Sequence, residues 1–248
     1  MNDFDPPALP PILAAGRPAA HPAQSELPLG EDPRDLEPMH GPFAAVESLL
    51  RHPRRIVYGL RQGDAGDLTR TLLLIAVLCS LVYGFVVGTF SRHDQLWAAP
   101  VKIAGGLLVS AFICLPSLYI FSCLSGARAR LQEVGGLIAG LVALMTVLLV
   151  GFAPVAWIFS QSTESVAAMG ALHLLFWLIA TWFGLRFLQA GFAHLGGSPT
   201  GLRIWILVFL LVMLQMTAAL RPLVGTADTF LPTDKKFFVG HWMENLQK

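Results

Sequence analysis

The feature that most constrains this chain is an uncharged, mostly apolar run from Val134 to Thr163, which opens VGGLIAGLVALMTVLLVGFAPVAWIF. The hydrocarbon core of a bilayer is about 30 Å thick, so roughly 20 apolar helical residues cross it. This run is long enough to cross with tilt or a kink to spare. The sequence therefore predicts a membrane-spanning helix here.

Four further apolar runs predict that the chain crosses the membrane about five times, with spans near 72–90, 100–124, 166–189 and 204–220. Charged residues make up 13% of the chain and hydrophobic residues 54%, with a mean hydropathy of +0.61. Soluble domains carry about 25% charged residues. We therefore expect an all-α, polytopic membrane helix bundle of about five transmembrane helices, with its membrane domain over 71–222.

The segment before the spans differs sharply in composition. Residues 1–42 contain ten prolines and show no sustained helical period. Such a segment cannot bury enough apolar surface to fold, so we expect a disordered, Pro-rich N-terminal tail with polyproline II tendency. Pro7 and Pro10 have the PxxP spacing of a ligand for a partner domain, and a plain linker is the alternative.

Residues 43–70 are predicted to form an amphipathic juxtamembrane helical segment that Pro53 interrupts. One helical face carries the apolar residues Phe43, Val46, Leu49 and Leu50. Four arginines stand beside apolar residues, namely Arg51, Arg54, Arg55 and Arg61. The segment can lie in the membrane interface with its arginines near anionic headgroups, or it can dock on the protein itself.

The distribution of basic residues around the spans predicts an orientation. With a cytoplasmic N-terminus, the inner segments hold nine basic residues, Arg51, Arg54, Arg55, Arg61, Arg70, Arg128, Arg130, Arg186 and Arg203. The outer segments then hold five, Arg92, Lys102, Arg221, Lys235 and Lys236. Because basic residues concentrate on the cytoplasmic side, we expect the N-terminus inside and the C-terminus outside.

Glycine and proline inside the spans predict how the helices pack. Gly84 and Gly88 form a GxxxG pair, which lets another helix approach closely. Pro116 and Pro154 each remove a backbone hydrogen bond and bend their spans. We expect Ser117 or a neighbouring helix to satisfy the carbonyl that Pro116 frees.

Four spans each carry a polar residue at a similar depth. At about 1.5 Å per residue, Tyr83 lies roughly 10 Å deep and Ser110 roughly 15 Å deep. On the same rise, His173 lies roughly 12 Å and Gln215 roughly 9 Å below the outer ends of their spans. One hypothesis is an intramembrane polar cluster that a small ligand or a file of water could use. The alternative is that His173 and Gln215 form hydrogen bonds that hold helices together.

Signatures of enzymes and cofactors are missing from the sequence. It has no HExxH, no GxSxG, no phosphate-binding P-loop and no pair of aspartates within a span, so we expect no catalytic, cofactor-binding or metal-binding residues. The three cysteines, Cys79, Cys114 and Cys123, all lie in spans, where a thiol packs as a small apolar group. The expected partners are the lipid bilayer and an unidentified membrane or peripheral protein, and no nucleic acid.

Three stretches carry a resemblance, LWAAPVKIAGGLLVSAFICLPSLYIFSCLSG, VGFAPVAWIFSQSTESVAAMGALHLLFW and LQMTAALRPLVGTADTFLPTDKKFFVGHW. Over 45–242 the chain resembles a family of bacterial multi-span inner-membrane proteins that is usually left uncharacterised. The resemblance implies the bacterial cytoplasmic membrane and a C-terminal contact region. The five-span layout is also similar to Yip1-type membrane proteins in architecture. In the tail at 223–248, aromatic residues suit an interface or a docking groove, so the candidate contact residues are Arg221, Pro222, Phe237, Phe238 and Trp242.

Two functions of different classes are consistent with these patterns. The first is a non-enzymatic scaffold or accessory subunit of a membrane complex, whose tails and amphipathic segments bind partner proteins. The second is a small-molecule transporter, permease or channel component, with a path formed by the kinks at Pro116 and Pro154 and by the polar level around His173.

Overall fold

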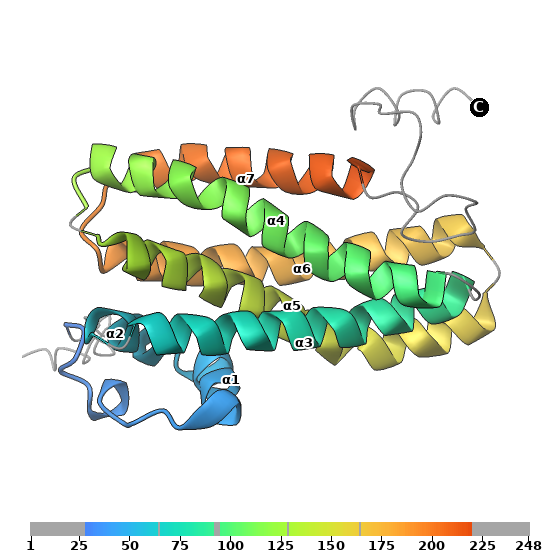
Figure 1. Ribbon diagram of the computed structural model, residues 1–248, viewed down its shortest axis with the longest axis horizontal. Coiled ribbons are helices and arrows are strands. Elements are labelled where there is room, and N and C mark those ends of the chain that lie inside the picture. Colours follow the sequence, from blue (N-terminus) through green and yellow to red (C-terminus); the bar gives the residue numbers. More distant parts are fainter. Residues whose placement is uncertain (1–27, 64, 92–94, 128, 164, 220–248) are drawn as a thin grey trace, which may run out of the picture.

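The computed structural model describes residues 28–63, 65–91, 95–127, 129–163 and 165–219. Over these residues the chain is all-helical (Figure 1). The elements in chain order are the 3-10 helix η1 (Pro33–Asp35) and the helices α1 (Gly41–Arg51), α2 (Pro53–Arg61), α3 (Ala65–Ser91), α4 (Gln95–Leu124), α5 (Leu131–Ser162), α6 (Val166–Ala193) and α7 (Pro199–Ala219).

Five of these helices, α3 to α7, are long and apolar enough to cross a membrane, which confirms the predicted fold class and describes a multi-pass membrane protein. Four of them, α3, α4, α5 and α7, begin earlier than the apolar runs. For example, α3 starts at Ala65 and includes the exposed residues Asp67 and Arg70 before its apolar part. Apolar runs mark the hydrocarbon, whereas the backbone hydrogen bonds of a helix continue into the polar interface.

The five long helices run along one direction, and α5 lies at the centre (Figure 1). Helix α5 packs against both α3 and α6, α4 packs on α3, and α7 lies at the edge against α4. In the most apolar 18-residue window of each helix, 72% of the residues of α5 are buried, against 22% in α7. The bundle is therefore built around the uncharged apolar run of 134–163.

Two glycines show why the helices approach so closely. A Cβ placed on Gly140 of α5 would lie 2.6 Å from Cε1 of Phe187 on α6, and one on Gly84 of α3 would overlap the backbone of Pro100 on α4. Both positions therefore require the absence of a side chain. The GxxxG pair in α3 thus serves an approach within this chain, because Gly84 meets α4.

Helices α1 and α2 dock on the bundle. In α2 the buried residues are Ile56, Val57 and Leu60, and in α1 they are Ala45, Ser48 and Leu49. Of the two predicted placements for 43–70, docking on the protein is therefore the one found for α2. The apolar face predicted for α1 is partly wrong, since Phe43 is 90% and Leu50 49% exposed. The small residues Ala45 and Ser48 let α1 pack closely, and this turns Phe43 outward.

The prediction of a disordered tail over 1–42 is wrong for residues 28–42, which are ordered against α2. Arg55 donates from Nε to the Glu37 carbonyl (2.9 Å) and from Nη2 to the Pro38 carbonyl (2.8 Å). Arg54 donates to Asp35 (3.4 Å), a carboxylate that also accepts from the Gly30 amide. Hydrogen bonds from α2 thus hold this segment in place, together with the partly buried side chains of Leu29 and Met39. Residues 1–27 lie outside the described residues.

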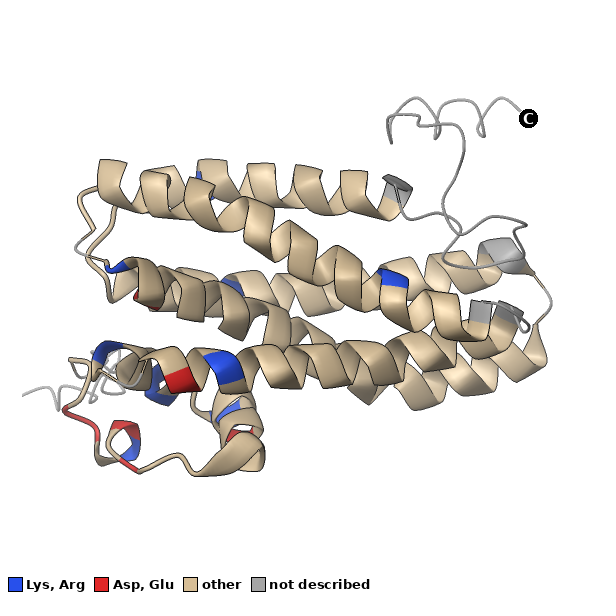
Figure 2. Ribbon diagram, in the orientation of Figure 1, with Lys and Arg blue, Asp and Glu red and all other residues tan. Residues whose placement is uncertain are grey.

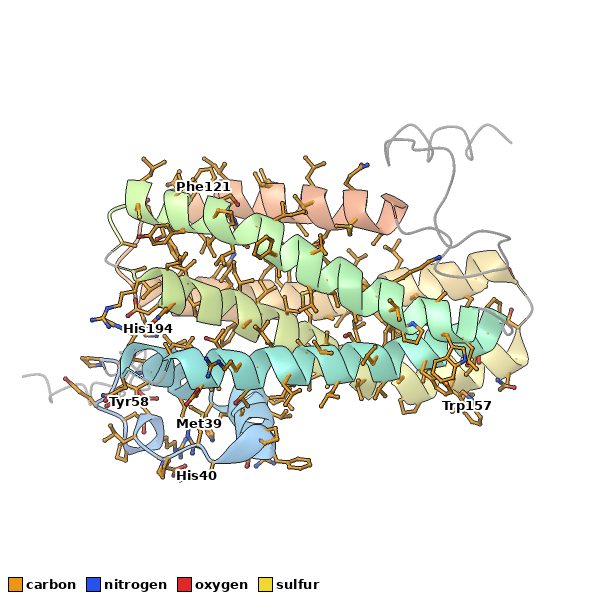
Figure 3. The ribbon with its side chains drawn as sticks, viewed as in Figure 1. Met39, His40, Tyr58, Phe121, Trp157 and His194 are labelled. Carbon is orange, nitrogen blue, oxygen red and sulfur yellow. The ribbon has the colours of Figure 1, made fainter. Side chains whose placement is uncertain are left out.

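Charged side chains gather at the end of the bundle that carries α1 and α2 (Figure 2). Figure 3 shows Met39, His40, Tyr58 and His194 at this same end and Trp157 at the opposite end. Arg61 of α2 donates to the His194 carbonyl (3.1 Å) and so ties α2 to the end of α6. We refer to this as the inner end and to the opposite one as the outer end, following the predicted orientation.

Candidate intramembrane polar site

Two of the four predicted polar residues meet in the outer half of the bundle. Tyr83 of α3 and His173 of α6 are both buried, and Oη of Tyr83 lies 2.7 Å from Nδ1 of His173. Their rings are edge to face, with centroids 5.7 Å apart. The tyrosine hydroxyl donates when Nδ1 is unprotonated and accepts when Nδ1 carries the hydrogen. This hydrogen bond joins two spans that lie on different sides of α5.

Among the residues that the structure describes, four buried polar atoms of the long helices have no hydrogen-bond partner, namely Oγ1 of Thr69, Oγ of Ser110, Oγ of Ser122 and Nε2 of His173. A buried polar atom left in this state costs about 1–3 kcal/mol. Nε2 of His173 and Oγ of Ser110 lie at the Tyr83–His173 pair and on the groove beside it, so a bound water or a small polar ligand there would supply a missing hydrogen bond.

Ser110 lies on a groove between α4, α6 and α7. Lys102, Gly106 and Ser110 recur every four residues and share one face of α4. The groove is also lined by Trp177 of α6 and Met213 of α7, and it encloses about 20 Å³. That volume holds about one water molecule. Trp177 follows His173 by one turn of α6, so the groove and the Tyr83–His173 pair are neighbours along that helix.

Lys102 is the polar residue whose environment the sequence analysis missed. It was counted among the basic residues of the outer segments, yet it is only 2% exposed. The signal available in the sequence was its four-residue spacing from Gly106, a position where α4 has no side chain of its own. A neighbouring helix that packs over such a position also covers the lysine.

Gln215 lies on another side of α7. It is half-buried and follows the buried Met213 by two residues, which places it about 200° around the helix axis from the groove. The structure therefore brings Tyr83 and His173 together, places Ser110 on the adjoining groove, and turns Gln215 elsewhere.

The part of α4 around Pro116 is tied to α7. Ser117 donates from Oγ to the Cys114 carbonyl (2.8 Å), and Trp205 of α7 donates from Nε1 to Ser117 (3.0 Å) and to Cys114 (3.2 Å). The prediction was that Ser117 or a neighbouring helix satisfies the carbonyl that Pro116 frees; both Ser117 and α7 form hydrogen bonds here, but with another carbonyl. The carbonyl they reach is that of Cys114, whereas Pro116 removes the partner of the carbonyl four residues earlier, at Phe112. Trp205 was not singled out from the sequence.

Within the described ranges, no group of three or more His, Cys, Asp or Glu side chains is arranged to hold a metal ion. The polar groups described above offer hydrogen bonding by hydroxyl and imidazole groups and by the amine of Lys102. The candidate contact residues Arg221, Pro222, Phe237, Phe238 and Trp242 lie outside the described residues.

Comparison with known proteins was made at the level of families, single proteins and folds. No family model matches the chain, and no curated protein and no solved structure matches it. The observations that bear on function are therefore the five-span fold, the docked inner end and the polar groups described above.

Proposed function

We propose that this protein is a non-enzymatic scaffold or accessory subunit of a membrane complex. The observation that carries the proposal is the covered inner end of the bundle, where α2 packs against both α5 and α6. Because α2 closes the inner end of the bundle, a solute that moved along the centre of the bundle would have to pass α2. The outer faces of the long helices, in contrast, are accessible to other proteins.

The contacts of α2 support this reading. A Cβ on Gly136 of α5 would lie 2.9 Å from Cδ1 of Leu60, and one on Gly191 of α6 would lie 3.4 Å from Cγ2 of Val57. Two apolar side chains of α2 therefore sit at glycine positions of two spans. Hydrogen bonds from Arg54 and Arg55 add the segment from Pro28 onward as a further layer.

We also propose that the protein resides in the bacterial cytoplasmic membrane with its N-terminus in the cytoplasm and its C-terminus outside. The support is the resemblance to bacterial inner-membrane proteins and the excess of arginine at the inner end. Reporter fusions at residue 1 and after Lys248 test the orientation, and a C-terminal reporter that is active only in the cytoplasm contradicts it.

Photo-crosslinking in intact membranes tests the scaffold function. A photoreactive amino acid is placed at Phe112, Leu178 or Leu207, which are 77%, 60% and 68% exposed on α4, α6 and α7. We expect a photoreactive group on one of these faces to cross-link to a single membrane protein, in an amount that rises with the expression of this chain. Purification of that partner protein should in turn recover this chain. The buried Leu141 serves as the control site that captures no other protein. Cross-links to lipid alone on all three faces contradict the proposal.

A transporter or channel component is the second candidate, and the specific observation in its favour is the buried polar set of Tyr83, His173 and Lys102 in one half of the bundle. Buried polar and ionisable groups in spans often mark ion or substrate pathways. Flux of protons or small solutes into liposomes that contain only this protein supports this candidate. Loss of that flux in both Tyr83→Phe and His173→Phe locates the path.

A further inference from the structure

Helix α1 has an apolar side that no described part of the protein covers. Its inward face holds Ala45 and Leu49, whereas Phe43 is 90% and Leu50 49% exposed. Residues seven positions apart lie about 20° from each other around a helix. Phe43 and Leu50 therefore project from one side of α1, away from the bundle.

The packing of α1 defines its height along the spans. Ala45 lines the same cavity as Leu68 and Thr71 of α3. At this turn α3 passes from the exposed charges of Asp67 and Arg70 to the apolar run that begins at Leu72. Helix α1 therefore lies where α3 enters the hydrocarbon. Figure 1 shows α1 running across the direction of the long helices, which is the direction of the membrane surface.

The side of α3 that α1 occupies is continuous with a lipid-facing stripe. Thr71 and Leu78 are about 20° apart around α3. Leu74, Leu78 and Val82 on this stripe are 52%, 54% and 53% exposed. Because these residues face lipid tails deeper in the membrane, the position of α1 on the same side of α3 is flanked by lipid headgroups.

The charges of this region indicate how α1 contacts lipid. Arg54 and Arg55 are bonded to the segment from Pro28 to Pro38, so they are engaged within the protein. Arg51 pairs with Glu47 (3.4 Å) at an exposed site, which leaves little net charge on the outer side of α1. Contact with lipid therefore rests mainly on the two apolar side chains.

From these observations we propose that α1 is an interfacial helix that lies on the inner leaflet and inserts Phe43 and Leu50 between phospholipid headgroups. The predicted interfacial segment is thus narrowed to α1, and its contact is apolar rather than made by arginines. The inference rests on the multi-pass fold and is independent of the proposed scaffold function.

The test uses the full chain alone in lipid nanodiscs, one copy per disc. Phe43→Cys is labelled with an environment-sensitive fluorophore in a variant whose three native cysteines are replaced by alanine. Arg34→Cys, at an exposed position on η1, is the matched control. We expect a blue-shifted spectrum and at least twofold stronger quenching by headgroup-labelled nitroxide lipid at position 43 than at position 34. Equal quenching of both labels by an aqueous quencher overturns the proposal.

Two further outcomes separate lipid from other occupants. If the blue shift at position 43 appears only with two copies per disc, or only after a membrane extract is added, a protein covers this face and the proposal is wrong. Phe43→Ser with Leu50→Ser provides the second measurement. We expect at least tenfold faster hydrogen exchange over 41–51 and unchanged exchange in α5. Unchanged exchange in α1 would contradict the inference.

Discussion

Helices α5 and α7 are both apolar enough to cross a membrane, but α5 lies at the centre of the bundle and α7 at its edge. Their most apolar windows have mean hydropathies of 2.5 and 1.8, yet 72% of that window is buried in α5 and only 22% in α7. Hydropathy places both in the membrane and does not say which one is central. The difference lies in small residues, since α5 buries Gly136, Ala139, Gly140 and Ala143, where neighbouring helices come close. Helix α7 is held instead by a few large side chains, among them Trp205.

The largest effect is expected when a side chain is added to α5 at the centre of the bundle. Gly140→Leu places atoms where Phe187 already lies, so we expect loss of the folded bundle, beyond the about 1–3 kcal/mol typical of overpacking. The measurement is the yield of monodisperse protein after purification. Gly151→Leu on the same helix is the control, because no atom lies within 4 Å of its Cβ position. Equal yields would contradict the central role of α5.

A matched pair of leucine truncations sharpens the same comparison. Leu149 of α5 is fully buried and Leu211 of α7 is 54% exposed. We expect Leu149→Ala to lower the free energy of unfolding by about 2–5 kcal/mol, because it leaves a cavity. Leu211→Ala should leave it unchanged, since lipid replaces the lost contact. Unfolding in mixed detergent micelles measures both, and a similar loss in the two variants would show that α7 is covered by protein.

Trp205→Phe tests how the edge helix is attached. In the native chain the ring centroids of Trp205 and Phe209 are 5.2 Å apart. The variant keeps an aromatic ring at this position and removes the hydrogen bonds to Cys114 and Ser117. Hydrogen bonds between membrane helices contribute about 0.6–2 kcal/mol, so we expect a loss in that range and faster hydrogen exchange in α7 alone. Trp182→Phe, at a 63% exposed position, is the control. Faster exchange in α5 as well would mean that α7 is part of the core.

The smallest expected effect concerns the polar residues. In a double-mutant cycle, Tyr83→Phe and His173→Phe should be coupled by about 0.6 kcal/mol, as for other hydrogen bonds between membrane helices. His173→Phe and Gln215→Leu should be additive, because Gln215 lies on another side of α7. Unfolding free energies measure both cycles. Coupling of equal size in the two would restore the four-residue cluster that the sequence suggested.

The position of each polar residue along its helix was predictable, and its direction around the helix was not. Tyr83 and His173 were expected at similar depths and do meet, because both also face the interior. Gln215 was expected at a similar depth, but it lies on a side of α7 that faces away from the groove. Lys102 was assigned to the outer surface and is buried, since α4 turns that side toward α7. A single sequence contains the rise per residue of a helix but not the positions of its neighbours.

The N-terminal region shows the same limit. Its proline content predicted disorder over 1–42, yet residues 28–42 are ordered by hydrogen bonds from Arg54 and Arg55. The sequence left open whether the segment that carries those arginines lies in the membrane interface or docks on the protein itself. Which carbonyls they reach depends on the path of the preceding chain over α2, and no local pattern encodes that path.

The sequence alone predicted that this chain is all-helical, that it has five runs long and apolar enough to cross a membrane, and where along each helix its polar residues lie. These properties follow from the cost of placing charges and unpaired backbone groups in hydrocarbon, a cost that each residue carries with it. Only the tertiary structure decided that α5 is central, that α2 covers the inner end, and that Tyr83 meets His173 while Phe43 faces outward. These depend on which helices can approach closely, and that is a property of pairs of surfaces rather than of any one segment.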